Sequence, residues 1–322
     1  MTNNLTVFVR RLTGLVLAWV ACGVVAADFD YGLQPKQIAP DTWVLEGSTD
    51  DFSYANGGNI VNTAFVVTTE GVLVIDTGPS RQYGEQLRAA IARITGQPIV
   101  AVLNTHHHPD HFLGNQAFGA DKVKALAQTI ALIGEEGGAF NDNMYRLAGH
   151  AMAGTEVTPP GAAIGAGPMV LGNHRFDILE MTGHTPADLA VFDRTTGVLF
   201  AADLLFHKRA PTTPHASLAD WNKALDRLAK IPARLIVPGH GPVSADDTPI
   251  RQTRAWLQWL EETLRESAND GLDMNEVLAR PMPEALRALS LARAEFTRSV
   301  SHLYPDIELD ALDSAGDRQA KR

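Results

Sequence analysis

Short apolar runs with the length and branched content of β-strands recur along the chain. In the first half they lie at residues 42–45, 60–67, 72–75 and 99–103. In the second half they lie at residues 175–181, 189–192, 198–202 and 235–237. Segments with helical spacing stand between several of these runs, so the pattern predicts an α/β fold in which helices cover mixed sheets.

Helices are predicted where apolar residues recur every three or four positions. The clearest such segments are residues 83–94, 125–147 and 221–228. Ser80 stands where an N-cap residue of the first helix is expected. Glycines at positions 134, 137 and 138 predict breaks in the second helix. The Pro- and Gly-rich segment 158–168 is predicted to be a loop.

The pattern becomes purely helical from Thr248 onward. Trp256, Leu257, Leu260 and Leu264 form the apolar stripe of one long helix, and the apolar residues of 286–296 predict another. We therefore expect a single α/β sandwich domain at residues 28–268 and a helical extension at 269–322. The polar segment after Asp310 is expected to lack fixed structure.

The N-terminus has the features of a signal peptide. Arg10 and Arg11 precede a short apolar stretch at residues 12–20, and the small residues 25–27 offer a cleavage site before Asp28. A membrane anchor is the alternative, but the apolar run is marginal for the roughly 20 residues that a span needs. We expect cleavage after residue 27, a periplasmic or secreted protein, and no stable membrane span afterwards.

Charge and cysteine content limit the partners and the metal ligands that the chain can use. The chain has 322 residues and a formal net charge of −10; residues 1–27 carry two arginines and no acid, so residues 28–322 carry −12. Such a surface repels phosphate backbones, which argues against a nucleic-acid partner. Cys22, the only cysteine, lies in the predicted signal peptide. Any metal site must therefore use His, Asp and Glu side chains.

One short segment concentrates metal-binding side chains directly after the predicted strand at 99–103. His106, His108, Asp110 and His111 follow one another within six positions. Alternation along an extended backbone points His106 and His108 the same way. Three imidazoles and one carboxylate in one loop suit zinc.

Three more potential ligands follow later strands in the same manner. His184 comes after the strand at 175–181, Asp203 ends the strand at 198–202, and His240 follows the strand at 235–237. Side chains at strand ends can be gathered in one cleft by a sheet scaffold. The sequence therefore predicts one metal centre built from both halves of the chain.

These seven residues resemble, in order and spacing, the metal signature of the metallo-β-lactamase superfamily. The resemblance spans about residues 42–240 and implies an αβ/βα sandwich with the site at one edge. It implies that His106, His108 and His184 bind a first metal ion. It also implies that Asp110, His111 and His240 bind a second ion.

The same resemblance assigns the remaining acids. Asp203 would bridge the two ions, and Asp76 would orient the loop that carries the ligands. Two zinc ions are the expected cofactors, with iron or manganese as alternatives. A hydroxide held between the ions would attack the substrate, and Asp110 would take part in the proton transfer that follows.

The implied function is hydrolysis of an ester, thioester, lactone or amide in a small-molecule substrate. An Asp at position 203 resembles glyoxalase II and lactonases, whereas the zinc β-lactamases carry Cys or Ser there. Residues 111–115, 202–206 and 298–305 resemble the quinoprotein-relay metallohydrolases and their relatives from sulfur-oxidation clusters, so a periplasmic cytochrome or quinoprotein is the expected partner. A mononuclear-iron sulfur dioxygenase and a non-hydrolytic accessory protein of a periplasmic redox pathway remain as alternatives.

Overall fold

The computed structural model describes residues 28–320, so the predicted signal peptide lies outside the described residues. The α/β prediction is confirmed, because two β-sheets form the centre of the fold. The first sheet has seven strands in the order β1-β2-β3-β4-β5-β6-β7. The second has five strands in the order β12-β11-β10-β9-β8.

The first sheet is antiparallel from β1 to β4 and parallel from β4 to β7. Its strands are β1 (Lys36–Ala39), β2 (Thr42–Leu45), β3 (Thr63–Thr68), β4 (Gly71–Ile75), β5 (Ile99–Leu103), β6 (Val123–Ala125) and β7 (Ala162–Ala163). The parallel half matters for the site, because β4 and β5 end side by side at the edge where the predicted ligand loop begins.

The second sheet is antiparallel except for β12, which runs parallel to β11. Its strands are β8 (Gly167–Leu171), β9 (His174–Met181), β10 (Asp188–Asp193), β11 (Val198–Phe206) and β12 (Leu235–His240). Leu73 and Leu103 of the first sheet share one buried cluster with Val191 and Phe200 of the second. The two sheets therefore pack face to face as a sandwich.

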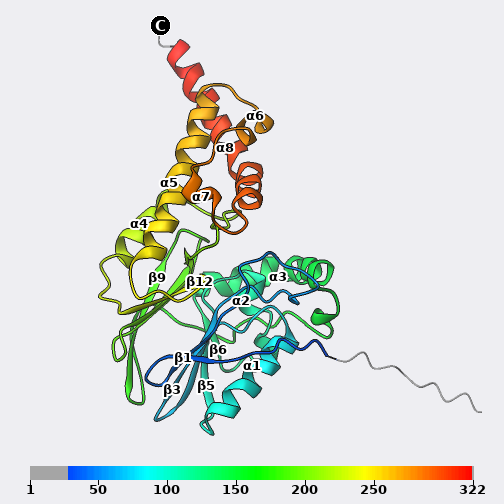
Figure 1. The fold of residues 1–322 in the computed structure, drawn as a ribbon, viewed down its shortest axis with the longest axis vertical. Helices are drawn as coiled ribbons and strands as arrows, with labels where there is room; N and C mark the ends of the chain where they lie inside the picture. The colour runs from blue at the N-terminus through cyan, green and yellow to red at the C-terminus, as the bar shows by residue number, and fades with distance from the viewer. Residues whose placement is uncertain (1–27, 321–322) are drawn as a thin grey trace, which may run out of the picture.

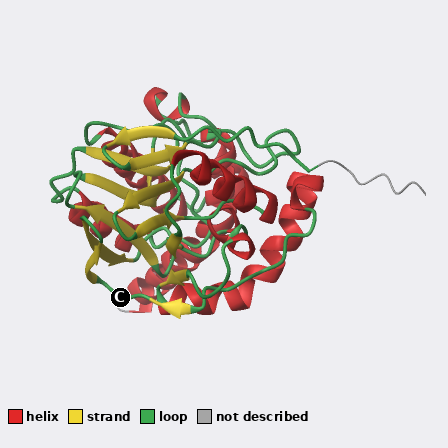
Figure 2. Ribbon diagram, turned by 90° about the horizontal axis from the view of Figure 1, so that it is seen from below, coloured by secondary structure: helices red, strands yellow, loops and turns green. Residues whose placement is uncertain are grey.

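Helices cover the outer faces of the sandwich, as the strands and helices of Figure 2 show. In chain order they are α1 (Arg81–Ile94), α2 (Pro109–Phe112), η1 (Asn115–Ala117), α3 (Ala127–Ala148), η2 (Gly149–Met152), α4 (Leu218–Leu228) and α5 (Thr248–Asn269). Ser80 caps α1 by accepting a hydrogen bond from the backbone N–H of Tyr83, as predicted. Leu87 and Ile91 of α1 pack on the first sheet, and Trp221 of α4 packs on the second.

The predicted breaks in the second helix are wrong, because α3 runs without interruption from Ala127 to Ala148. Gly137 has a packing role in this helix. A Cβ at that position would stand 3.0 Å from Val157 and 3.4 Å from Phe112, so the glycine allows a close approach to the segment beside the ligand loop. Gly134 and Gly138 face open space and lower helix propensity only modestly.

Two predicted strands and one predicted loop need correction. The run at 60–67 becomes strand only from Thr63, since Ile60 and Val61 turn toward the metal-site edge, where Ile60 O accepts a bond from His240. Strand β11 continues past position 202 to Phe206, because it pairs with β12 across register shifts. The segment 158–168 is not all loop: it contains β7 and the start of β8, which complete sheet edges that local composition does not reveal.

The extension is helical as predicted, but its helices differ in extent. They are α6 (Met274–Leu278), α7 (Glu284–Arg287) and α8 (Ala292–Ala320). The helix expected at 286–296 is interrupted, since Leu291 has a φ of +58° and Ser290 bonds to the loop after β11. The expectation of no fixed structure after Asp310 is wrong, because α8 continues to Ala320.

Helices α5 and α8 pack on one another and extend beyond the sheets (Figure 1). Trp256 and Leu264 of α5 and Phe296 and Tyr304 of α8 belong to the same buried cluster as the outer face of the second sheet. The boundary predicted between residues 268 and 269 stays a prediction. Among the described residues, no helix combines the length and apolarity needed to cross a membrane.

Truncating Leu264 to Ala tests whether α5 is part of the main core. Leu264 is fully buried in the cluster that joins α5, α8 and the second sheet. We expect Leu264→Ala to lower the free energy of unfolding by about 2–5 kcal/mol, because it leaves a cavity. The matched control is Leu309→Ala on α8, where the side chain is 60% exposed. Equal denaturant midpoints for the two variants would contradict the expectation.

Candidate metal centre

Four of the predicted ligands come from the loop and short helix after β5. His108 is the N-cap of α2, with Pro109 at its first position, so Asp110 and His111 stand on the first turn of that helix. All four side chains are buried. This tight turn therefore brings His106, His108, Asp110 and His111 to one edge of the sandwich.

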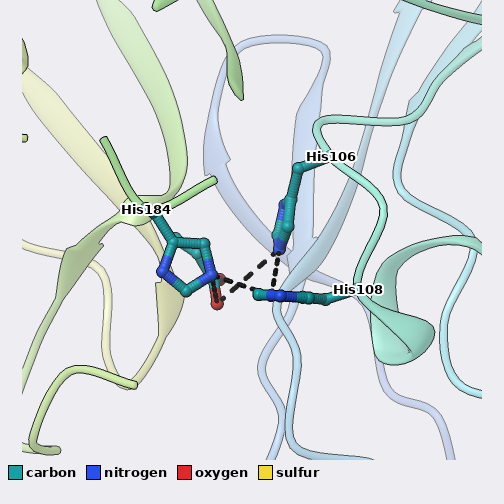
Figure 3. Close-up of side chains that lie close together, drawn as sticks. His106, His108 and His184 are labelled. Carbon is teal, nitrogen blue, oxygen red and sulfur yellow. Dashed lines mark hydrogen bonds and ion pairs between the residues drawn. The ribbon is translucent and has the colours of Figure 1, made fainter. Parts of the chain in front are cut away.

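The first cluster gathers His106, His108, His184 and Asp203, whose nearest ligand atoms all lie within 4.8 Å of one another. Nδ1 of His108 is 3.1 Å from Nε2 of His106 and 2.9 Å from Nε2 of His184. Figure 3 shows these three rings converging on one point. His184 Nε2 is also 3.3 Å from Oδ2 of Asp203.

The second cluster gathers Asp110, His111 and His240 within the same limit. Nε2 of His111 lies 3.6 Å from Oδ2 of Asp110 and 3.2 Å from Oδ1 of Asp203. Nε2 of His240 lies 3.5 Å from Oδ2 of Asp110 and 3.1 Å from Oδ2 of Asp203. The Asp203 carboxylate therefore stands between the two clusters, and its role as a bridging ligand stays a prediction.

An irregularity in β11 places Asp203. The register with β12 shifts on either side of Ala202, whose φ of +47° is unusual for a residue with a side chain. The neighbouring β12 carries Gly239 beside this bulge, and a Cβ there would overlap Oδ1 of Asp203. The glycine thus leaves the space that the carboxylate occupies.

Asp76, at the end of β4, supports the ligand loop. Its Oδ1 accepts a bond from the Thr105 backbone N–H (2.8 Å), and its Oδ2 accepts bonds from the Thr105 hydroxyl (2.8 Å) and from Nδ1 of His111 (2.8 Å). Burial raises the pKa of Asp76 from its ordinary value, and the bonds from His111 and Thr105 oppose that rise. The structure thereby places Asp76 where the sequence expected an orienting acid.

Two more rings have hydrogen-bond partners on the side away from the clusters. Nδ1 of His240 donates to the Ile60 carbonyl (2.8 Å), and Nδ1 of His106 lies 3.1 Å from the Thr105 hydroxyl. In each case the nitrogen that faces the cluster is left free of protein donors. This arrangement is typical of metal-binding histidines.

The electrostatics of the site favour a bound cation. Burial lowers the pKa of His106 and His108 well below the usual value, and neighbouring imidazoles lower it further, so both rings are neutral. For His111, burial is outweighed by the nearby carboxylates, Asp203 foremost, which hold its pKa well above the usual value. For Asp203, burial is outweighed by the imidazoles, His240 foremost, which hold its pKa well below the usual range. The site therefore combines neutral lone pairs with an ionised acid.

Four buried atoms of the seven predicted ligands have no hydrogen-bond partner: Oδ2 of Asp110, Nε2 of His111, Nδ1 of His184 and Oδ1 of Asp203. Buried polar atoms are rarely left in that condition without an ion or water to satisfy them. They belong to the residues that sequence analysis named as ligands. The residues present thus fit a pair of divalent cations with nitrogen and oxygen ligands.

The clusters open into a cavity of about 480 Å³. Its walls include the apolar side chains of Phe52, Ile60 and Phe140 and the polar side chains of His215, Arg298 and His302. None of these six side chains was predicted to belong to the site. Only Arg298 and His302 had a signal, because they fall within the stretch 298–305 that resembles a narrower group of metallohydrolases.

Comparison with known proteins identifies the family. The family described as the metallo-beta-lactamase superfamily matches residues 56–240, more than half of the chain and the part that holds all seven predicted ligands. The chain belongs to the metallo-β-lactamase superfamily. A solved metallo-beta-lactamase from Pontibacter korlensis shares the superfamily fold, with a TM-score of 0.58 and 24% identity over 70% of this chain and 99% of that one.

Two curated relatives are named as hydrolytic enzymes. The linear primary-alkylsulfatase of Pseudomonas sp. (strain ATCC 19151) is 23% identical over 279 residues, covering 72% of this chain and 52% of the relative. The hydroxyacylglutathione hydrolase of Thermosynechococcus vestitus is 29% identical over 150 residues, covering 46% of this chain and 51% of the relative. The chain spans about half the length of these two superfamily relatives.

Gly239→Ala tests the placement of Asp203. The added methyl group would overlap the carboxylate and push it from its position between the clusters. We expect the purified variant to keep its fold but to retain less than half of the metal of the unaltered protein, measured by elemental analysis and circular dichroism. Gly134→Ala is the matched control, because a methyl group there meets open space. Full metal content in Gly239→Ala would contradict this account.

Proposed function

We propose that this chain is an exported, dinuclear metal-dependent hydrolase that uses zinc. His106, His108 and His184 would hold the first ion, Asp110, His111 and His240 the second, and Asp203 both. The observation that carries the proposal is the buried Asp203 carboxylate between two clusters of imidazoles, with unpartnered buried atoms on Asp203 itself and on neighbouring Asp110 and His111. A buried carboxylate with three neighbouring imidazole nitrogens suits a bridging position between two cations.

Two divalent ions held here would lower the pKa of a shared water toward neutrality and polarise the substrate oxygen. The chain supplies the remaining functions. Asp110 lines the cavity and its Oδ2 is buried and unpartnered, so it can accept the proton released on attack. Phe52, Ile60 and Phe140 line the cavity, where they can bind an apolar part of the substrate and limit the access of water.

The substrate class that we propose is a small ester, thioester, lactone or amide. The names of the alkylsulfatase and the hydroxyacylglutathione hydrolase support hydrolysis of a bond to an acid group. Asp at position 203 supports a general hydrolase of this kind rather than a β-lactamase. We further propose that the protein works in the periplasm beside a quinoprotein or sulfur oxidation system, supported by the leader sequence at 1–27 and the stretch 298–305.

Metal analysis of the unsupplemented protein, combined with a hydrolysis screen, tests this function. We expect about two zinc ions per chain and turnover of at least one thioester, lactone or ester. Asp203→Asn should abolish turnover, whereas Asp226→Asn, on the exposed face of α4, should not. One iron per chain with oxygen uptake would point to a sulfur dioxygenase instead. Two zinc ions without turnover on any acyl substrate would point to an accessory protein.

Asp76→Asn isolates the contribution of one carboxylate to metal binding. Asn tolerates the φ of +58° at this position, so the backbone should keep its conformation. The amide weakens the bond that orients His111, and we expect affinity for the second ion to fall about 10–100-fold. Competition against a chromophoric chelator measures this change.

Asp41→Asn is the matched control for Asp76→Asn. Asp41 has a similar φ of +56° but is exposed in the turn between β1 and β2, away from the metal centre. Its replacement should leave metal affinity unchanged. A wild-type affinity in Asp76→Asn would show that the carboxylate does not support the site.

A further inference from the structure

His108 differs from the other rings in how its outer nitrogen is supported. Its Nδ1 faces His106 and His184, so its Nε2 points away from the first cluster. That Nε2 lies 2.8 Å from Nδ1 of His215, on the segment between β11 and α4. A ring that offers a lone pair at Nδ1 carries its proton at Nε2, so His108 donates and His215 accepts.

The second nitrogen of His215 completes a consistent arrangement. With Nδ1 accepting, the proton of neutral His215 lies on Nε2, which faces Oε2 of Glu136 on α3 at 3.7 Å. The same carboxylate oxygen is 3.4 Å from Nε2 of the buried His107. His215 is therefore placed between a ring of the first cluster and an acid, as partners of metal-binding histidines commonly are.

The segment that carries His215 is held by the C-terminal helix. Thr212 donates a bond to Glu295 (2.7 Å), and the buried hydroxyls of Thr213 and Ser299 lie 2.6 Å apart. Arg209, also buried, is 3.6 Å from the Glu295 carboxylate. Residues 209–215 thus rest on α8, which lies beyond the superfamily match at 56–240.

We propose that His215 is a positioning residue for His108, and that helix α8 supports the first metal site by holding the segment that carries His215. This inference rests on the proposed dinuclear function. The second site does not depend on this support, because His111 bonds to Asp76 and His240 bonds to the Ile60 carbonyl. Disturbing His215, or the contact of its segment with α8, should therefore weaken binding of the first ion and leave binding of the second unchanged.

Cobalt titration of the full mature chain tests the role of His215. Co²⁺ is added to metal-free protein in competition with a chelator, and the visible absorption of each bound ion reports its coordination. We expect His215→Leu to lower the affinity for one of the two Co²⁺ ions about 10–100-fold and to leave the affinity for the other unchanged. His215→Asn should restore tight binding, because its Oδ1 can accept the bond from His108 without serving as a good ligand for the ion.

The Asn variant separates positioning from ligation and from simple packing. Equal loss in the Asn and Leu variants would overturn the positioning role, as would unchanged binding of both ions in His215→Leu. Melting of the metal-free variants checks the fold, and His215 is 35% exposed, so little change is expected there.

A pair of serines on α8 tests the support from the extension. Ser299→Ala removes the buried bond to Thr213. It should lower the affinity for the same Co²⁺ ion, followed by the same visible absorption band. Ser301→Ala, two positions along and exposed, should leave both ions unchanged. Equal cobalt affinities in the two variants would overturn the role of α8.

The wild-type titration separates this inference from the proposed function. Two Co²⁺ ions in the wild type with neither weakened in His215→Leu would overturn only the present inference. A single ion that is weakened in His215→Leu would overturn the dinuclear function and support the role of His215. A wild type that binds no ion would overturn both.

Discussion

The structure depends on keeping one ionised carboxylate, Asp203, buried among imidazoles. An isolated carboxylate at that depth would be strongly disfavoured, because burial removes its hydration. The imidazoles of His111, His184 and His240 compensate, and they hold its pKa well below the usual range. Each comes from a different part of the fold, so this compensation requires the two sheets and the α2 turn to meet at one edge.

The backbone around the site is shaped by the same requirement. Two residues at the centre have positive φ values. One is Ala202, which directly precedes Asp203, and the other is the supporting acid Asp76. Strain of this kind persists only where the surrounding structure enforces it. Here the enforcing contacts are the register shift between β11 and β12 and the three bonds that Asp76 accepts from Thr105 and His111.

The sequence brought the candidate ligands into view because they stand at the ends of predicted strands: His106, Asp203 and His240 each follow or end an apolar run. It failed where tertiary packing decided the outcome. Gly137 was predicted to break α3, but the helix is continuous there. The missing side chain lets the helix pack close to Phe112, a contact that no local pattern reveals. His215 lines the cavity from the segment after β11, which is bonded to α8 through Thr212 and Thr213, and its place in the sequence gives no sign of that contact.

The ionic contacts between α8 and the cavity are better explained by specificity than by stability. Buried Glu295 approaches Arg209 at 3.6 Å and Arg298 at 2.6 Å, and Arg298 also reaches Asp51 at 3.1 Å. Only the Arg209–Glu295 pair is buried on both sides. Replacing such a pair by apolar residues is often neutral or stabilising, so its energy alone does not account for it. The Arg209–Glu295 contact, however, joins α8 to the segment after β11 at one place along the helix. A charged pair is sensitive to a shift of the helix in a way that an apolar contact is not, so this pair favours the position of α8 in which His215 meets His108.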